Sequence, residues 1–132
     1  MSLFSLTDSF DSPIRSFSHG MKQKICVIGA LIHNPRLWVL DEPLTGLDPK
    51  SAFELKELMK EHCKEGNSVF FSSHVLEVVE KVCDKVAIID DGKLVTSFDI
   101  ADLKDMKDNK SLEDVFLSLT EDKPETDEVK FD

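Results

Sequence analysis

Two adjacent acidic residues, Asp41 and Glu42, have types and a position that could support chemistry. They follow four apolar residues, 37–40, and precede Pro43, which cannot donate to a strand ladder. Carboxylates at the end of a strand suit Mg²⁺, which proteins usually hold through one or two carboxylates, water and substrate phosphates. The second carboxylate could then orient or deprotonate an attacking water. The alternative is a buried strand that ends in two solvated acids.

The positions of apolar residues predict a strand directly before Asp41 and Glu42 and a helix before that strand. Residues 37–40 do not alternate, which is typical of a central strand covered on both faces. We expect a helix with Ser18 as its N-cap and Asn34-Pro35 at its end, whose residues 24–34 carry an apolar face. A serine beside a glycine at a helix start can bind an anion, although most such starts are caps alone. The apolar face of this helix carries Ile25, Ile28, Gly29 and Ile32.

The residues after the pair alternate between helix and strand. Asp48 as N-cap and Pro49 as first residue begin a helix that runs to about residue 64. A strand over 68–73 follows, with His74 just beyond it. This order indicates an α/β fold with a mainly parallel sheet and one antiparallel edge hairpin. The other expected elements are a helix over 75–82, strands 85–90 and 93–98 around the Asp91-Gly92 turn, and helices 99–104 and 111–120. In the helix that begins at Pro49 we expect Ala52, Leu55, Met59 and Cys63 to face inward, and we expect His33 and His62 on helix surfaces.

Charge and composition narrow the function classes. The chain has 132 residues, 41% of them hydrophobic, and a net charge of −10. Residues 97–132 contribute −7 of this charge, so the acidity belongs to the C-terminal segment and argues against general nucleic-acid binding. No apolar run approaches the roughly 20 residues of a membrane span. The three cysteines form no CxxC pair, and we expect reduced thiols in a cytosolic protein.

Four short motifs occur in a specific order: Ser18-His19-Gly20-Met21-Lys22-Gln23, the apolar strand with Asp41-Glu42-Pro43, Thr45-Gly46-Leu47-Asp48-Pro49, and Ser72-Ser73-His74 after a strand. Over roughly residues 14–98 this order resembles the C-terminal half of an ATP-binding-cassette (ABC) ATPase. The resemblance implies part of a RecA-like P-loop NTPase core. The acidic C-terminal helix also resembles that of bacterial ABC-2-type exporter ATPases.

The resemblance assigns nucleotide contacts to the first and third motifs. Ser18 and Gly20 match the signature loop, which contacts the γ-phosphate of ATP held by a partner subunit. His19 and Met21 depart from the commonest form of that loop and look like an exporter subgroup's variant. Asp48 matches the D-loop aspartate, which helps to couple the two sites of a dimer.

The remaining roles concern hydrolysis. Asp41 matches the Walker B aspartate, which holds Mg²⁺ through water. Glu42 matches the glutamate that polarises the attacking water. His74 matches the switch histidine, which senses the γ-phosphate. A capping or core role is the alternative for His74.

The P-loop pattern G-x-x-x-x-G-K-[ST] does not occur in this sequence. That loop cradles the phosphates in this enzyme class, so we expect a C-terminal fragment that is inactive alone. It could come from a truncated gene, a split gene or a shortened expression product. The resemblance places the missing P-loop strand between 68–73 and 85–90, which would leave two open strand edges. We expect strands to pair between chains there, rather than a gapped monomer or a direct pairing of 68–73 with 85–90.

The resulting hypothesis is a partial ATP-binding subunit of an ABC transporter, which couples ATP hydrolysis to substrate transport. The resemblance implies ATP and Mg²⁺ as cofactors, a membrane permease and a second ATPase subunit as partners, and a place on the cytoplasmic face of the membrane. The alternatives are a non-enzymatic remnant that binds a complete subunit, or a fragment of a DNA-repair or translation ABC ATPase. The expected domains are a remnant of an upstream helical region (1–12), the signature-to-switch-histidine half (13–98), a helical extension (99–120) and a disordered acidic tail (121–132).

Overall fold

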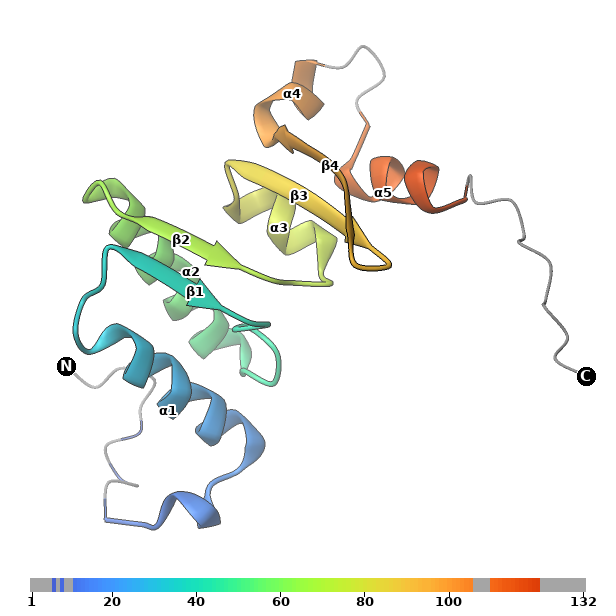
Figure 1. The fold of residues 1–132 in the computed structure, drawn as a ribbon. Coiled ribbons are helices and arrows are strands. Elements are labelled where there is room, and N and C mark those ends of the chain that lie inside the picture. Colours follow the sequence, from blue (N-terminus) through green and yellow to red (C-terminus); the bar gives the residue numbers. More distant parts are fainter. Residues whose placement is uncertain (1–5, 7, 9–10, 106–109, 122–132) are drawn as a thin grey trace, which may run out of the picture. The chain divides into compact units, whose positions relative to one another are not determined.

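The computed structural model describes residues 6, 8, 11–105 and 110–121 (Figure 1). The chain divides into two compact units, residues 1–74 and 75–132. Most of the expected remnant at 1–12 and nearly all of the expected tail at 121–132 lie outside the described residues. The elements of the first unit are η3 (Ile14–Ser16), α1 (His19–Leu31), β1 (Leu37–Leu40), α2 (Pro49–Lys64) and β2 (Ser68–Phe71). Those of the second unit are α3 (Leu76–Val82), β3 (Lys85–Asp90), β4 (Lys93–Asp99), α4 (Ile100–Asp105) and α5 (Leu112–Glu121).

The α/β architecture with one parallel and one antiparallel strand pair is confirmed. The four strands form two separate two-stranded sheets: β1 pairs in parallel with β2, and β3 pairs in antiparallel with β4. None of the helices in the described parts of the chain is long and apolar enough to cross a membrane.

Helix α2 covers one face of the β1–β2 sheet (Figure 1). Leu55 and Met59 of this helix are buried, as are Trp38 and Leu40 of β1. The start of α2 follows the predicted chemistry, because the Asp48 side chain caps it and Pro49 is its first residue. The cap fixes where the helix begins, and its buried face holds the helix against the sheet.

The prediction that β1 is covered on both faces is wrong for the described chain. Leu37 and Val39 are 54% and 67% exposed, and Phe70, paired with Val39, is 63% exposed. Side chains of alternate strand residues point to opposite faces, so these three share the face away from Trp38 and Leu40. The continuous apolar run of β1 therefore has one face packed on α2 and one apolar face open.

The predicted burial was wrong for two neighbouring residues of α2, the surface position His62 and the inward position Cys63. His62 is buried, and its ring stacks on Trp38 with 3.9 Å between centroids. Cys63 is exposed. Buried positions 51, 55, 59 and 62 follow a helical stripe, so the polar residue at 62 lies inside because Trp38 offers a flat ring to stack on.

Helix α1 begins at His19, directly after its cap Ser18. The Ser18 side chain accepts a hydrogen bond from Met21 N at 3.2 Å, which confirms the predicted N-cap. Val27 is the buried residue of this helix, whereas Ile32 is 80% exposed. Of the predicted apolar face, Ile25 and Ile28 are half-buried, whereas Gly29 and the C-cap residue Ile32 are exposed.

The second unit is built on the β3–β4 hairpin. Asp91 and Gly92 have φ values of 50° and 71°, the left-handed pair that a tight two-residue hairpin turn requires, so the predicted turn is confirmed. Ser111 and Asp114 bond reciprocally at the start of α5, which confirms the predicted capping box. The core of this unit consists of Ile100, Leu103 and Leu112, with Leu76, Val79, Cys83, Val86, Phe98 and Val115 packed against it.

Candidate functional site

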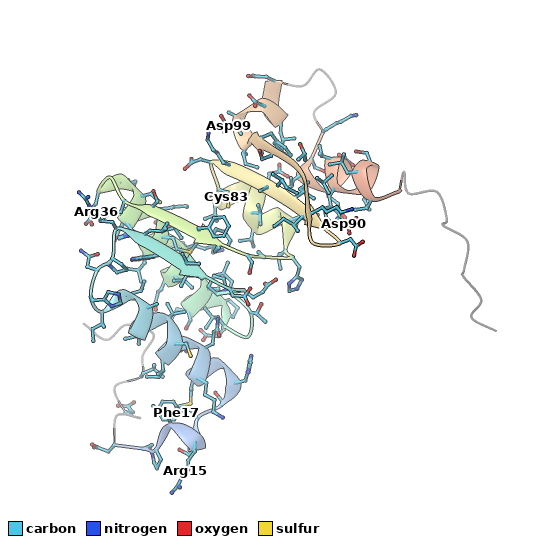
Figure 2. All side chains as sticks on the ribbon, in the orientation of Figure 1. Arg15, Phe17, Arg36, Cys83, Asp90 and Asp99 are labelled. Carbon is cyan, nitrogen blue, oxygen red and sulfur yellow. The ribbon has the colours of Figure 1, made fainter. Side chains whose placement is uncertain are left out.

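The carboxyl ends of β1 and β2 lie at the same edge of their sheet because the strands are parallel. Asp41 follows β1, and Ser72 follows β2. The backbone N–H of Ser72 donates to the Leu40 carbonyl at 3.0 Å, which extends the pairing beyond the last strand residue. In Figure 2 the label of Arg36 marks the opposite, N-terminal end of β1. The sheet thus brings Asp41, Glu42 and His74 into one cluster.

The Glu42 carboxylate has a partner on each oxygen. Oε1 lies 2.9 Å from His74 Nδ1, and Oε2 accepts from the Thr45 hydroxyl at 3.2 Å. The side chain of Glu42 is 36% exposed and that of His74 is 73% exposed, so water and a ligand can reach both. A carboxylate held in this way can orient a water or accept its proton, and the imidazole can bind an anion.

The backbone of Glu42 is held from two sides. Its N–H donates to Ser72 Oγ at 2.9 Å, and its carbonyl accepts from Gln23 Nε2 at 3.3 Å. The Ser72 hydroxyl also donates to Asp41 Oδ1. Sequence reasoning noted Ser72 and Gln23 within motifs but gave them no role, because their types alone do not reveal these bonds.

Asp48 links the start of α2 to Lys24 in the middle of α1. Its carboxylate accepts from Ser51 N at 3.1 Å and Ser51 Oγ at 2.7 Å, and forms an ion pair with Lys24 Nζ at 2.9 Å. The hydrogen bond from Lys24, followed by those from Ser51, holds the pKa of Asp48 well below its ordinary value. Asp48 is therefore ionised at neutral pH, and capping the helix occupies both of its oxygens.

Gly20 and Gly46 approach each other closely. A Cβ added to Gly20 would lie 2.8 Å from the Gly46 carbonyl oxygen, and one added to Gly46 would lie 2.7 Å from His19 Cδ2. Gly46 also has a φ of +77°, which favours glycine. The signature-like loop at Ser18 and Gly20 therefore packs on the loop before Asp48, and the two predicted groups of residues are neighbours.

The described residues contain no cluster of three or more His, Cys, Asp or Glu side chains that could hold a metal. A Mg²⁺ that arrives with a nucleotide needs fewer protein ligands, because phosphates and water complete its coordination. Asp41 is exposed, and Ser72 orients its carboxylate through Oδ1. The donor set therefore fits a phosphate-bound Mg²⁺ but not a metal held by protein alone.

The chain is similar to several known proteins. A family model described as "AAA domain, putative AbiEii toxin, Type IV TA system" matches residues 1–80. An uncharacterised ABC transporter ATP-binding protein of Nostoc sp. (all4389) is 39% identical over 99 residues, which cover 75% of this chain and 30% of the relative. The ABC transporter ATP-binding protein NatA of Bacillus subtilis is 33% identical over 115 residues, which cover 87% of this chain and 47% of NatA.

A solved structure described as the ATP-binding subunit of an ABC transporter matches with a TM-score of 0.73 and 32% identity, over 80% of this chain and 45% of that one. The chain thus spans less than half the length of each of these proteins. It belongs to the AAA-domain family of that model and is a partial ATP-binding-cassette ATPase.

Proposed function

We propose that this chain is part of the ATP-binding subunit of an ABC exporter, in which ATP hydrolysis is coupled to substrate transport through a membrane permease. The observation that carries the proposal is the cluster at the ends of β1 and β2. There Glu42 Oε1 lies 2.9 Å from His74 Nδ1, and Ser72 bonds both the Glu42 N–H and the Asp41 carboxylate. A carboxylate, an imidazole and a second carboxylate are the groups needed to position water, sense a phosphate and neutralise a nucleotide-bound cation.

In this proposal Asp41, Glu42 and His74 have separate tasks. Asp41 would hold Mg²⁺ through water, and the ion would neutralise charge on the β- and γ-phosphate oxygens of ATP. Glu42 orients the attacking water and accepts its proton at the carboxylate. The imidazole of His74 contacts the γ-phosphate and is joined to Glu42 by the hydrogen bond between them.

Ser18, Gly20 and Asp48 are assigned to the contact with a second ATPase subunit. Ser18 caps α1, so the first N–H groups of that helix and the serine hydroxyl point to one side, as an anion site requires. Asp48 caps α2 and is joined to α1 by its ion pair with Lys24. A phosphate contact at Ser18 could therefore be transmitted to the loop that carries Glu42.

Residues 13–98 form the ATPase portion in this proposal, and 99–120 form a helical extension. The sequence has no P-loop pattern, so nothing in it grips a triphosphate, and the chain alone should be inactive. This absence also favours a second candidate, a non-enzymatic remnant that binds a complete ATPase subunit. In both cases we place the chain at the cytoplasmic face of a membrane through its partners.

A chimaera tests the assignment of Glu42. Residues 13–98 replace the matching segment of B. subtilis NatA, a relative 33% identical to this chain. We expect the chimaera to hydrolyse ATP, and Glu42→Gln to lower the rate about a hundredfold or more while ATP still binds, because an amide cannot accept the proton. Glu61→Gln, an exposed carboxylate on α2, is the matched control. Unchanged hydrolysis in Glu42→Gln would remove Glu42 from this role.

MgATP binding by the unmodified chain tests the proposal that the chain alone is inactive. Isothermal titration with MgATP should give no binding of micromolar affinity, since the sequence has no P-loop pattern to grip the triphosphate. Stoichiometric micromolar binding would contradict the proposal that the chain lacks a triphosphate grip. In the chimaera, Ser18→Arg should abolish ATP-dependent dimerisation, and a dimer that still forms with ATP would reject the signature role of Ser18.

A further inference from the structure

Glu42 has an unusual backbone conformation for its residue type. Its φ is +44°, in the left-handed region that L-residues with a side chain rarely adopt. It also precedes Pro43, whose ring restricts the conformation of the residue before it. A residue in this conformation is strained and persists only when its surroundings hold it. The question is which groups hold Glu42.

Two side chains bind the peptide groups on either side of its Cα. Ser72, just after β2, accepts from the Glu42 N–H at 2.9 Å. Gln23, in α1, donates from Nε2 to the carbonyls of Glu42 at 3.3 Å and Pro43 at 3.2 Å. The two supports come from different elements, so the conformation of Glu42 depends on how β2 and α1 are placed around the end of β1.

The Ser72 hydroxyl uses both of its capacities in this site. It accepts from the Glu42 N–H through a lone pair, and it donates its proton to Asp41 Oδ1. A hydroxyl that donates to a carboxylate becomes a better acceptor, so the two bonds strengthen each other. Alanine would lose both bonds, whereas threonine carries the same hydroxyl.

We infer that Ser72 is a positioning residue for the Asp41–Glu42 pair, with Gln23 supporting the opposite side of the Glu42 backbone. One hydroxyl sets the direction of the Asp41 carboxylate and the left-handed backbone of Glu42. That backbone directs the Glu42 side chain toward His74, 2.9 Å away. The importance of this geometry for catalysis rests on the proposed function, but the geometry itself can be measured separately.

The test uses amide hydrogen exchange and NMR on the full chain. In the unmodified chain, the Glu42 amide should exchange about tenfold more slowly than the rate intrinsic to its sequence. In Ser72→Ala its exchange should become about threefold to tenfold faster and its ¹⁵N shift should move, because one hydrogen bond contributes about 0.5–1.5 kcal/mol. Ser72→Thr should restore both values. Ser68→Ala, an exposed serine at the start of the same strand, is the matched control and should change neither.

Three results would overturn the inference: an unprotected Glu42 amide in the unmodified chain, an unchanged amide in Ser72→Ala, or a failure of threonine to rescue it. The measurement in the unmodified chain keeps the test valid even if Ser72→Ala does not fold. The proposed function is tested by a separate measurement, the rate of ATP hydrolysis in the Glu42→Gln chimaera. Because the two experiments use different molecules and readouts, either idea can fail while the other stands.

Discussion

Gly20 and Gly29 lie in the same helix, α1, but an added methyl group would meet different surroundings at the two positions. A Cβ at Gly29 would have nothing within 4 Å. A Cβ at Gly20 would lie 2.8 Å from the Gly46 carbonyl oxygen, where 3.4 Å or more is ordinary contact. Replacing each by alanine therefore separates the helix preference of alanine from the packing of the signature-like loop.

The expected free energies have opposite signs. Gly29→Ala should stabilise the first unit by about 0.5–1 kcal/mol, because alanine loses less backbone freedom in a helix interior. Gly20→Ala gains less from this effect near the helix start and must displace a backbone group by more than half an ångström. Overpacking of this kind costs about 1–3 kcal/mol. We expect Gly20→Ala to be less stable than Gly29→Ala by about 2 kcal/mol.

Urea unfolding followed by tryptophan fluorescence measures this difference in the first unit alone. Trp38 is the only tryptophan of the chain and is buried against α2. A higher midpoint for Gly29→Ala and a lower one for Gly20→Ala, relative to the unmodified chain, are the expected results. If Gly20→Ala stabilised the unit as much as Gly29→Ala, the close approach of Gly20 to Gly46 would be refuted.

Three further predictions concern acid, the core and association. The pKa of Asp48 is lowered in the fold, so its carboxylate stabilises the fold above about pH 4 and loses this contribution as acid protonates it. Asp48→Asn should therefore flatten the fall of the urea midpoint below that pH. An unchanged acid dependence of the midpoint would contradict this. His62→Phe should raise the free energy of unfolding by about 1 kcal/mol, because phenylalanine keeps a ring on Trp38 and removes the buried, unpartnered Nε2. Unfolding followed by circular dichroism measures this, and a lower midpoint for the variant would count against the prediction. The chain should self-associate, because Leu37, Val39 and Phe70 form an open apolar face and each described strand pairs with one other strand alone. Light scattering should show this association, and Phe70→Lys should reduce it. A monomer at all concentrations would reject the prediction.

Local chemistry in the sequence was sufficient to predict several features. The caps at Ser18 and Asp48, the hairpin turn at Asp91-Gly92 and the capping box at Ser111 depend on residues a few positions apart. Their backbone preferences and short side-chain bonds act before any distant contact forms. The resemblance that the comparisons later supported rested instead on the order of four short motifs, which run from Ser18 to His74.

The sequence did not predict which face of β1 is covered or that His62 is buried. Four apolar residues in a row show that a strand can be buried on both faces, but only packing decides whether other elements cover both. In the described chain α2 covers one face alone, so Val39 is 67% exposed. His62 lies at an inward position of α2, and its burial depends on the ring of Trp38 in the facing strand β1.

By itself, then, the sequence determined the elements, their order and the residue types at the end of β1. Only the tertiary structure decided that Glu42 takes a left-handed backbone, that its carboxylate meets His74, and that Ser72 and Gln23 hold it there. The reason is physical: Ser72 lies 30 positions from Glu42 in the chain, and Gln23 lies 19 positions away. Hydrogen bonds over such separations form only after the parallel sheet and the packed helix have brought their donors and acceptors within about 3 Å.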